Sequence, residues 1–197
     1  MRVVQQSAEL LTPIKEGEML ELLEKAGRVC YKSESRIYNG SAPVFVQNIV
    51  KNNHQSVLEH ISLSFRLITD RGVSHELVRH RLASYSQEST RYVRYGDIEF
   101  VEPIGMPPNA LSLWADAMEE AESSYLQMLA ERISPEQARS VLPNSTKTEL
   151  IMTANLREWK HILYLRTSIA AHPQMRDLAD KIKRILEFNY PTIFKEV

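Results

Sequence analysis

The sequence has only one cysteine, Cys30, among its 197 residues. An intrachain disulfide and a cysteine-based zinc cluster are therefore excluded, and a reducing cytoplasm fits this composition. No apolar run approaches the roughly 18 residues that a membrane span needs. The first residues, MRVVQQSAEL, also lack the apolar run of a signal peptide. We expect a cytoplasmic protein with no membrane partner.

The chain also has almost no net charge and few glycines. The formal net charge is -1, which argues against bulk electrostatic attraction to nucleic acid. The 6 glycines form neither a GxGxxG nor a GxxxxGK[ST] motif. A bound nucleotide would therefore be held by side chains and helix ends, and not by a Rossmann or P-loop turn.

A metal site is not predicted either. The sequence has no HExxH pattern and no paired cysteines. His75 and His80 are five residues apart, which places them about 140° apart around a helix and not on one face. A structural or ligand-facing role fits these histidines better than metal binding.

Hydrophobic periodicity predicts a single α+β domain over residues 1–197. In residues 56–69, the apolar side chains of Ile61, Leu63, Phe65 and Leu67 alternate with polar ones, as in a half-buried strand. Further short strands are expected at 2–11, 98–103 and 148–155. Helices are expected at 17–30, 44–52, 71–82, 109–133, 155–168 and 173–188, with a short helix opening at Ser134 and Pro135. We expect a small, mostly antiparallel sheet surrounded by long helices.

One stretch, VRHRLASYSQESTRYV at 78–93, concentrates cations and hydroxyls. Arginine dominates here, and no lysine lies between residues 71 and 94. The guanidinium fork can grip a phosphate or carboxylate at two points. Arg79 and Arg81 point about 200° apart on a helix, so they would serve two ligands, or one ligand and a neighbouring subunit. The segment predicts an anion site, with a solvated helix end as the alternative.

A nucleophile is not evident from the sequence. Ser89 lacks the GxSxG context of a nucleophile elbow, and Cys30 ends an amphipathic helix without a flanking signature.

The same stretch carries a family resemblance. RHRLASYSQES, an Arg-His-Arg followed after seven residues by Ser89, resembles the signature of the flavin-dependent thymidylate synthases. Upstream, HQSVLEHISLSF is similar to another block of that family. Downstream, ARSVLP and TANLREWKHILYLR follow in the expected order, so the resemblance covers roughly residues 20–190.

The resemblance implies the reductive methylation of dUMP to dTMP. Methylenetetrahydrofolate would supply the carbon and NADPH-reduced FAD the hydride, in a homotetramer that holds FAD and dUMP between subunits. Two alternatives use the same arginines: a non-catalytic nucleotide- or RNA-binding protein, and a different flavin or nucleotide enzyme. The neutral charge and few aromatic platforms disfavour RNA.

The resemblance also implies the site residues. The implied FAD contacts are His54, Ser56, Arg79, His80, Arg81, Gln87, Asn155, Arg157 and His161. The implied dUMP shell is Glu76, Arg79, Gln87, Glu88, Ser89, Thr90, Arg91, Arg139 and Arg166. Arg166 is the implied catalytic residue, a cation beside the uracil N3. The flavin does the chemistry in this family, so Ser89 is expected to hold substrate.

Plainer interpretations of these residues exist. Asn155 and Arg157 could cap and solvate a helix start, and His161 could be a core histidine. Arg166 could pair with an acid on its own or a nearby helix, such as Glu158 or Asp177.

The chain departs from the family pattern at three places. Ser86-Gln87 replaces a common Asn-Glu, and AAHPQMR at 170–176 leaves the role of His172 open. Glu76 stands where Gln is common. A carboxylate repels a phosphate unless it is paired, so we expect Glu76 to hold Arg79.

Overall fold

Two nine-residue strands, β3 (Ser62–Asp70) and β6 (Lys147–Asn155), form the centre of the computed structural model, which describes residues 1–195. They pair antiparallel along their whole length. The shorter strands β2 (Ser7–Leu10) and β4 (Ser84–Gln87) flank them, so the sheet has the antiparallel order β2-β3-β6-β4. The predicted small antiparallel sheet is confirmed.

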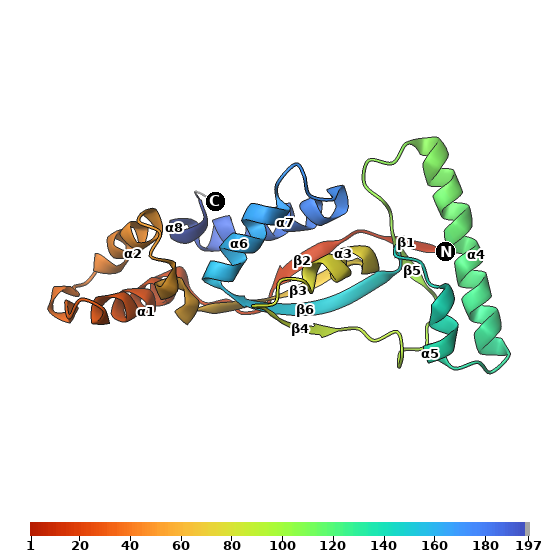
Figure 1. The fold of residues 1–197 in the computed structure, drawn as a ribbon, viewed down its shortest axis with the longest axis horizontal. Helices are drawn as coiled ribbons and strands as arrows, with labels where there is room; N and C mark the ends of the chain where they lie inside the picture. The colour runs from red at the N-terminus through yellow and green to blue at the C-terminus, as the bar shows by residue number, and fades with distance from the viewer. Residues whose placement is uncertain (196–197) are drawn as a thin grey trace.

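A second, parallel pair joins β1 (Arg2–Val4) to β5 (Glu99–Val101) beside one end of this sheet (Figure 1). The predicted strand at 2–11 is therefore two strands in two different sheets. The predicted strand at 56–69 begins too early, because Gln55–His60 form a 3-10 helix. The edge strand β4 lies at Ser84–Gln87, where neither a helix nor a strand was predicted.

Helices make up most of the remaining structure, as predicted. The α-helices are α1 (Glu16–Val29), α2 (Ser41–Lys51), α3 (Arg71–Leu77), α4 (Pro108–Ala130), α5 (Pro135–Ala138), α6 (Leu156–Arg166), α7 (Pro173–Asn189) and α8 (Pro191–Phe194). Further 3-10 turns lie at Glu34–Arg36 and Arg139–Val141. Ser134 precedes α5, but its hydroxyl faces the Gln137 side chain and makes no backbone cap.

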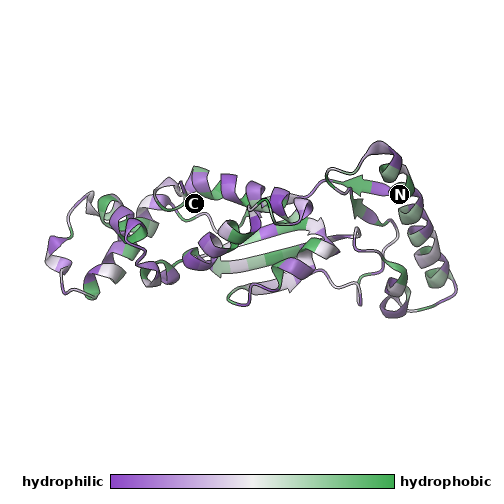
Figure 2. Cartoon of the chain, turned by 45° about the horizontal axis from the view of Figure 1, so that its top comes forward, coloured by the Kyte–Doolittle hydropathy of each residue, from purple (hydrophilic) through white to green (hydrophobic). Residues whose placement is uncertain are grey.

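The elements form three groups along the long axis of the molecule (Figure 1). Helices α1 and α2 lie beyond one end of the sheet, α6 and α7 pack on one of its faces, and α4 stands at the other end. The main core joins the sheet to α6 and α7, and a smaller one lies under α4 around Phe100, Met118 and Tyr125. Figure 2 shows hydrophobic residues along the central strands and hydrophilic residues along much of the covering helices.

Each central strand leads directly into a capped helix. The Asp70 carboxylate accepts a hydrogen bond from the Val73 amide at 2.7 Å and so caps α3. The Asn155 side chain accepts one from the Glu158 amide at 2.9 Å and caps α6. Because the two strands are antiparallel, α3 and α6 begin at opposite ends of the pair and approach each other at their C-termini.

Gly27 on α1 is expected to tolerate no side chain. A Cβ there would lie 2.7 Å from Cε1 of Phe45, a ring that also carries the Arg28 guanidinium 4.4 Å from its centroid. Overpacking of this kind costs about 1–3 kcal/mol, so Gly27→Ala should lower the free energy of unfolding. Gly17→Ala on the same helix is the control, since nothing lies within 4 Å of its Cβ. In a urea titration, the free energy of unfolding of Gly17→Ala should rise by up to about 1 kcal/mol. Equal effects of the two variants would contradict this account.

Candidate functional site

The side chain of Arg166, the last residue of α6, lies where α3 and α6 meet. Its Nη1 donates to Oε2 of Glu76 at 2.8 Å, and its Nη2 donates to the Glu76 carbonyl at 3.3 Å. The expectation that Glu76 holds Arg79 is therefore wrong. The expected alternatives Glu158 and Asp177 are also not the partners of Arg166, since Asp177 binds Gln6 and Lys181.

His80 holds the other side of the same guanidinium. The Nε of Arg166 donates to Nε2 of His80 at 3.0 Å. An imidazole nitrogen that accepts this bond carries no proton, so His80 is neutral here. Burial, then repulsion by Arg166 and His161, lowers the pKa of His80 to about 4. The proton of the neutral ring therefore belongs on Nδ1, which faces Oε1 of Glu158 at 3.6 Å.

Tyr85 on β4 fixes the backbone around His80. Its hydroxyl lies within hydrogen-bond distance of the carbonyls of Leu77 at 2.6 Å and His80 at 3.0 Å, at and just after the end of α3, and each carbonyl also accepts one backbone N–H. Burial raises the pKa of Tyr85 to about 12, so the phenol keeps its proton and remains a donor. Tyr85 was not predicted from the sequence as a site residue, and Glu158 was predicted only as a possible partner of Arg166.

His80 is expected to make the protein less stable in acid. Its folded pKa is about 4 and its ordinary value is 6.5, so the unfolded chain binds more protons between these values. Stability should fall by up to about 3 kcal/mol as the pH drops through this window. His80→Gln removes the titrating group. Urea unfolding at about pH 7.5 and about pH 5 should show a smaller loss in this variant than in the wild type. Equal losses would contradict the prediction.

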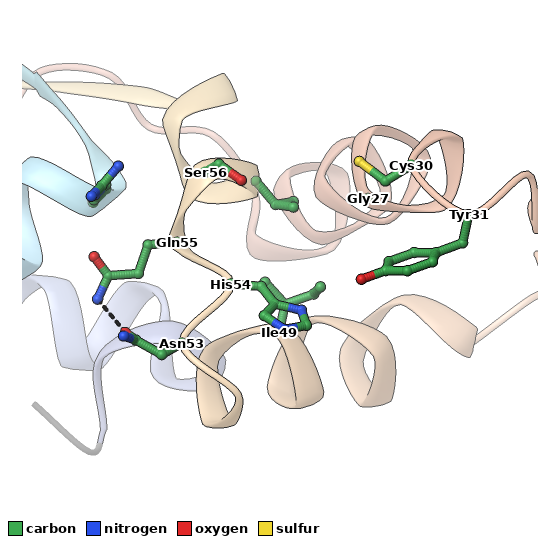
Figure 3. Close-up of a pocket in the computed structure, with 10 residues that line it drawn as sticks. Gly27, Cys30, Tyr31, Ile49, Asn53, His54, Gln55 and Ser56 are labelled. Atoms are coloured by element: carbon green, nitrogen blue, oxygen red, sulfur yellow. Dashed lines mark hydrogen bonds between the residues drawn. The ribbon is translucent and has the colours of Figure 1, made fainter.

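Two adjoining pockets lie beside this network. The first, of about 410 Å³, opens between α1, α2 and the Gln55–His60 turn (Figure 3). Its lining comprises Gly27, Cys30, Tyr31, Ile49, Asn53, His54, Gln55, Ser56, Val57 and Arg157. The second, of about 450 Å³, is lined by Gln55, Arg79, His80, Arg81, Leu82, Arg157, Glu158 and His161. Both pockets are lined by Gln55 and Arg157, so they adjoin each other, and the two together are called here the basic groove.

The basic groove gathers seven of the nine residues expected at a flavin. The exceptions are Asn155, which caps α6, and Gln87. The amide nitrogen of Gln87 donates to the hydroxyls of Ser74 and Thr148, both at 3.0 Å, so it joins β4 to α3 and β6. His161 is exposed and lines the groove, so the core-histidine alternative is wrong.

The expected dUMP shell falls into two groups. Glu76, Arg79 and Arg166 lie around the end of α3, whereas the segment from Glu88 to Arg91 lies beyond β4, near α5. There Arg91 pairs with Glu136 at 3.0 Å, and Arg139 donates to Thr90 at 3.2 Å. Within residues 1–195, no hydrogen bond or ion pair joins Ser89–Arg91 or Arg139 to Arg166.

Glu88 belongs to the second group by position, but its carboxylate is bound by other protein side chains. Its carboxylate accepts from the Tyr95 hydroxyl at 2.8 Å and pairs with Lys147 at 3.3 Å. Burial, then the hydrogen bond and charge of Glu88, raises the pKa of Tyr95 well above its ordinary value. In this chain the Glu88 charge is already neutralised by protein groups.

Across the described residues, no group of three or more His, Cys, Asp or Glu side chains is arranged to hold a metal ion. Within the same range, none of the helices combines the length and hydropathy of a membrane span.

The fold and the basic groove define an α+β protein with a cationic binding groove. The family model of thymidylate synthase complementing protein matches residues 14–192, and the chain belongs to this family of enzymes. The flavin-dependent thymidylate synthase of Mycolicibacterium gilvum is 36% identical over 195 residues, covering 89% of this chain and 78% of the relative. That of Mycobacterium tuberculosis is 35% identical with the same coverage. The predicted family resemblance is confirmed.

A solved structure is similar over nearly the whole fold. It is that of the UMP/dUMP methylase PolB from Streptomyces cacaoi, bound with 5-Br dUMP. The TM-score is 0.85 at 26% sequence identity, with 99% of this chain and 96% of that chain covered.

Proposed function

We propose that this protein, as one domain over residues 1–197, converts dUMP to dTMP by reductive methylation. Methylenetetrahydrofolate supplies the carbon, and FAD, reduced by NADPH, supplies the hydride. The observation that carries this proposal is the basic groove, which gathers seven of the nine residues expected at a flavin in a member of this family.

The chemistry of the groove fits FAD. Arg79 and Arg81 are exposed cations on its wall that match the two phosphates of the cofactor, and Arg157 is a third, paired with Glu59 at 2.5 Å. The first pocket adds the exposed ring of Tyr31 and the imidazole of His54, flat groups against which a ring system can stack. When bound, the flavin supplies the redox chemistry of the reaction, so no protein nucleophile is needed.

Arg166 acts on the substrate in this proposal. Its side chain is only 20% exposed, so its charge is less screened by water than that of a surface arginine. A fixed cation beside the uracil N3 stabilises the negative charge that develops on the ring. Ser89 and the neighbouring loop hold the substrate by hydrogen bonds.

We infer that a second copy of the chain completes the site in a homotetramer. The two groups of expected dUMP residues are not joined within one chain, and a partner could bring its own second group to the first. The chain exposes 11345 Å², whereas a compact monomer of 22.7 kDa exposes about 9,500 Å². The excess of roughly 1,800 Å² is about twice the 800 Å² that one partner buries in a standard interface. A tetramer needs two such interfaces on each chain.

The first experiment measures colour and turnover. Purified protein should be yellow and should form dTMP from dUMP with NADPH and methylenetetrahydrofolate. A colourless protein that neither binds FAD nor converts dUMP would contradict the proposal. Tight, strongly salt-dependent binding of an oligonucleotide, without dUMP binding, would favour the nucleic-acid alternative. Light scattering that shows a stable, active monomer would contradict the tetramer.

UMP is a second candidate substrate. PolB is described as a UMP/dUMP methylase, and this chain covers 96% of its length against 78% of the mycobacterial relatives. The same assay with UMP in place of dUMP decides between the two. Formation of 5-methyl-UMP at a comparable kcat/KM would extend the activity to both, and no product from UMP would restrict it to dUMP.

A further inference from the structure

All three nitrogens of the Arg166 guanidinium are held by the chain itself. The carboxylate and the backbone carbonyl of Glu76 accept hydrogen bonds from Nη1 and Nη2, and His80 accepts one from Nε. A guanidinium carries five N–H groups, so these three bonds leave two N–H groups for a ligand. Arg166 is therefore fixed before any ligand arrives and still has donors to offer.

The partners of Arg166 come from one short segment at the end of α3. Glu76 lies in the last turn of α3, and His80 follows three residues after the helix ends. The carbonyl of Glu76 is a terminal helix carbonyl, where the macrodipole favours a cation. The carboxylate of Glu76 is 33% exposed, but it faces the Arg166 charge at 2.8 Å and is neutralised by it.

His80 can accept the hydrogen bond from Arg166 only when its imidazole is neutral. Among residues 1–195, four side chains that carry titratable or charged groups face its ring or backbone: Arg166, Glu158 and His161 from α6, and Tyr85 from β4. The Arg166 cation and the buried setting both oppose a charge on His80. Although His80 lines the second pocket, its side chain is only 5% exposed, which leaves little surface for a direct ligand contact.

We propose that Glu76 and His80 are positioning residues for Arg166, and that their effect on methylation passes through that arginine rather than through direct contacts with dUMP and FAD. This inference rests on the proposed function in placing Arg166 against the uracil. The physical reason is preorganisation, since the rotamer entropy of a free arginine side chain must otherwise be lost at each binding event. Outer partners that orient a metal ligand typically change activity by about 10- to 100-fold, and we expect an effect of the same scale here.

A double-mutant cycle tests the inference. Glu76→Ala and His80→Leu should each lower kcat by about 10- to 100-fold, with KM for dUMP changed less than about 3-fold. Glu76→Gln and His80→Gln keep an acceptor for Arg166 and should stay within about 5-fold of the wild type. In an Arg166→Ala background, removing Glu76 or His80 should lower kcat by less than about a further 2-fold.

The proposal would be overturned if removing Glu76 or His80 lowered kcat by the same factor in the Arg166→Ala background as in the wild type. Independent effects of this kind would show that Glu76 or His80 acts directly on a ligand. Loss of bound flavin as the main effect of His80→Gln would do the same. Glu187→Gln is the matched control, a carboxylate-to-amide change in the α7 ion pair with Lys183 at 3.8 Å. It should leave kcat and KM unchanged.

A measurement without turnover separates this proposal from the proposed function. In protein labelled with ¹³C-histidine, the His80 ring signal is assigned from its absence in His80→Gln. It should not titrate between about pH 8 and about pH 5 in the wild type, but in Arg166→Ala its midpoint should rise by at least about one pH unit. An unchanged midpoint would overturn the contact, whether or not the protein methylates anything. If the His80 midpoint rises as expected in Arg166→Ala while the protein methylates no uridylate, the proposed function is contradicted but the contact that positions Arg166 is supported.

Discussion

Replacing Arg166 with alanine should lower kcat for methylation by about 100- to 1,000-fold while the protein keeps its flavin. This is the usual effect of removing one preorganised group that stabilises charge in a transition state. Arg166 lies outside the lining of the basic groove, so cofactor binding should survive its loss. The measurement pairs steady-state kinetics with the flavin absorbance of the purified variant.

Arg166→Lys is the informative comparison for this result. Lysine keeps the charge but not the fork, so it cannot reach Glu76 and His80 at the same time. Turnover should remain well below the wild type, although above that of alanine. Unchanged turnover in Arg166→Ala would remove the residue from the mechanism, and loss of flavin together with activity would assign it to cofactor binding.

Replacing Trp159 with alanine should have the largest effect on stability. Trp159 on α6 is fully buried and packs edge-on against Phe65 of β3, with ring centroids 5.0 Å apart. Its indole N–H donates to the Leu63 carbonyl at 3.1 Å. Losing both the area and the bond should cost about 3–5 kcal/mol. The melting temperature should fall by roughly 6–20 °C at fixed protein concentration.

Trp159→Phe separates the two contributions. Phenylalanine keeps most of the ring packing but loses the hydrogen bond from the indole to the Leu63 carbonyl, which is paired with Ala154 in the sheet, at a cost of about 0.5–1.5 kcal/mol. A loss as large as that of Trp159→Ala would mean that the hydrogen bond, and not the packing, dominates. A loss below about 1 kcal/mol for alanine would show that α6 is not anchored to the sheet at this position.

Alternation made the central strands predictable, but composition concealed an edge strand. Leu63, Phe65 and Leu67 all point into the core, as their spacing predicted. In SYSQ at 84–87 the inward positions are Tyr85 and Gln87, whose polar ends find partners on α3. A strand that buries polar side chains has no hydrophobic pattern, so its alternation was missed.

The site residues were predicted one by one, while their pairings were not. The family motifs indicated Glu76, His80 and Arg166, but Arg166 is 90 residues from Glu76 along the chain. Only the sheet register and the two capped helices bring them together. The inference that Glu76 needs a cation was sound, but the choice of Arg79 followed sequence proximity. Local spacing cannot identify a partner that tertiary structure supplies.

The meeting of α3 and α6 over the central strands also constrains chain length. The 9 residues of β3 span roughly 30 Å. Helix α3 has 7 residues and α6 has 11, which correspond to about 10 Å and about 16 Å. Helices that start from opposite ends of the strand pair therefore almost fill the distance between them. One residue inserted in α6 would turn Arg166 by about 100° and advance it by about 1.5 Å, away from Glu76 and His80. Relatives that share this chemistry should therefore vary in their loops while keeping the lengths of these two helices.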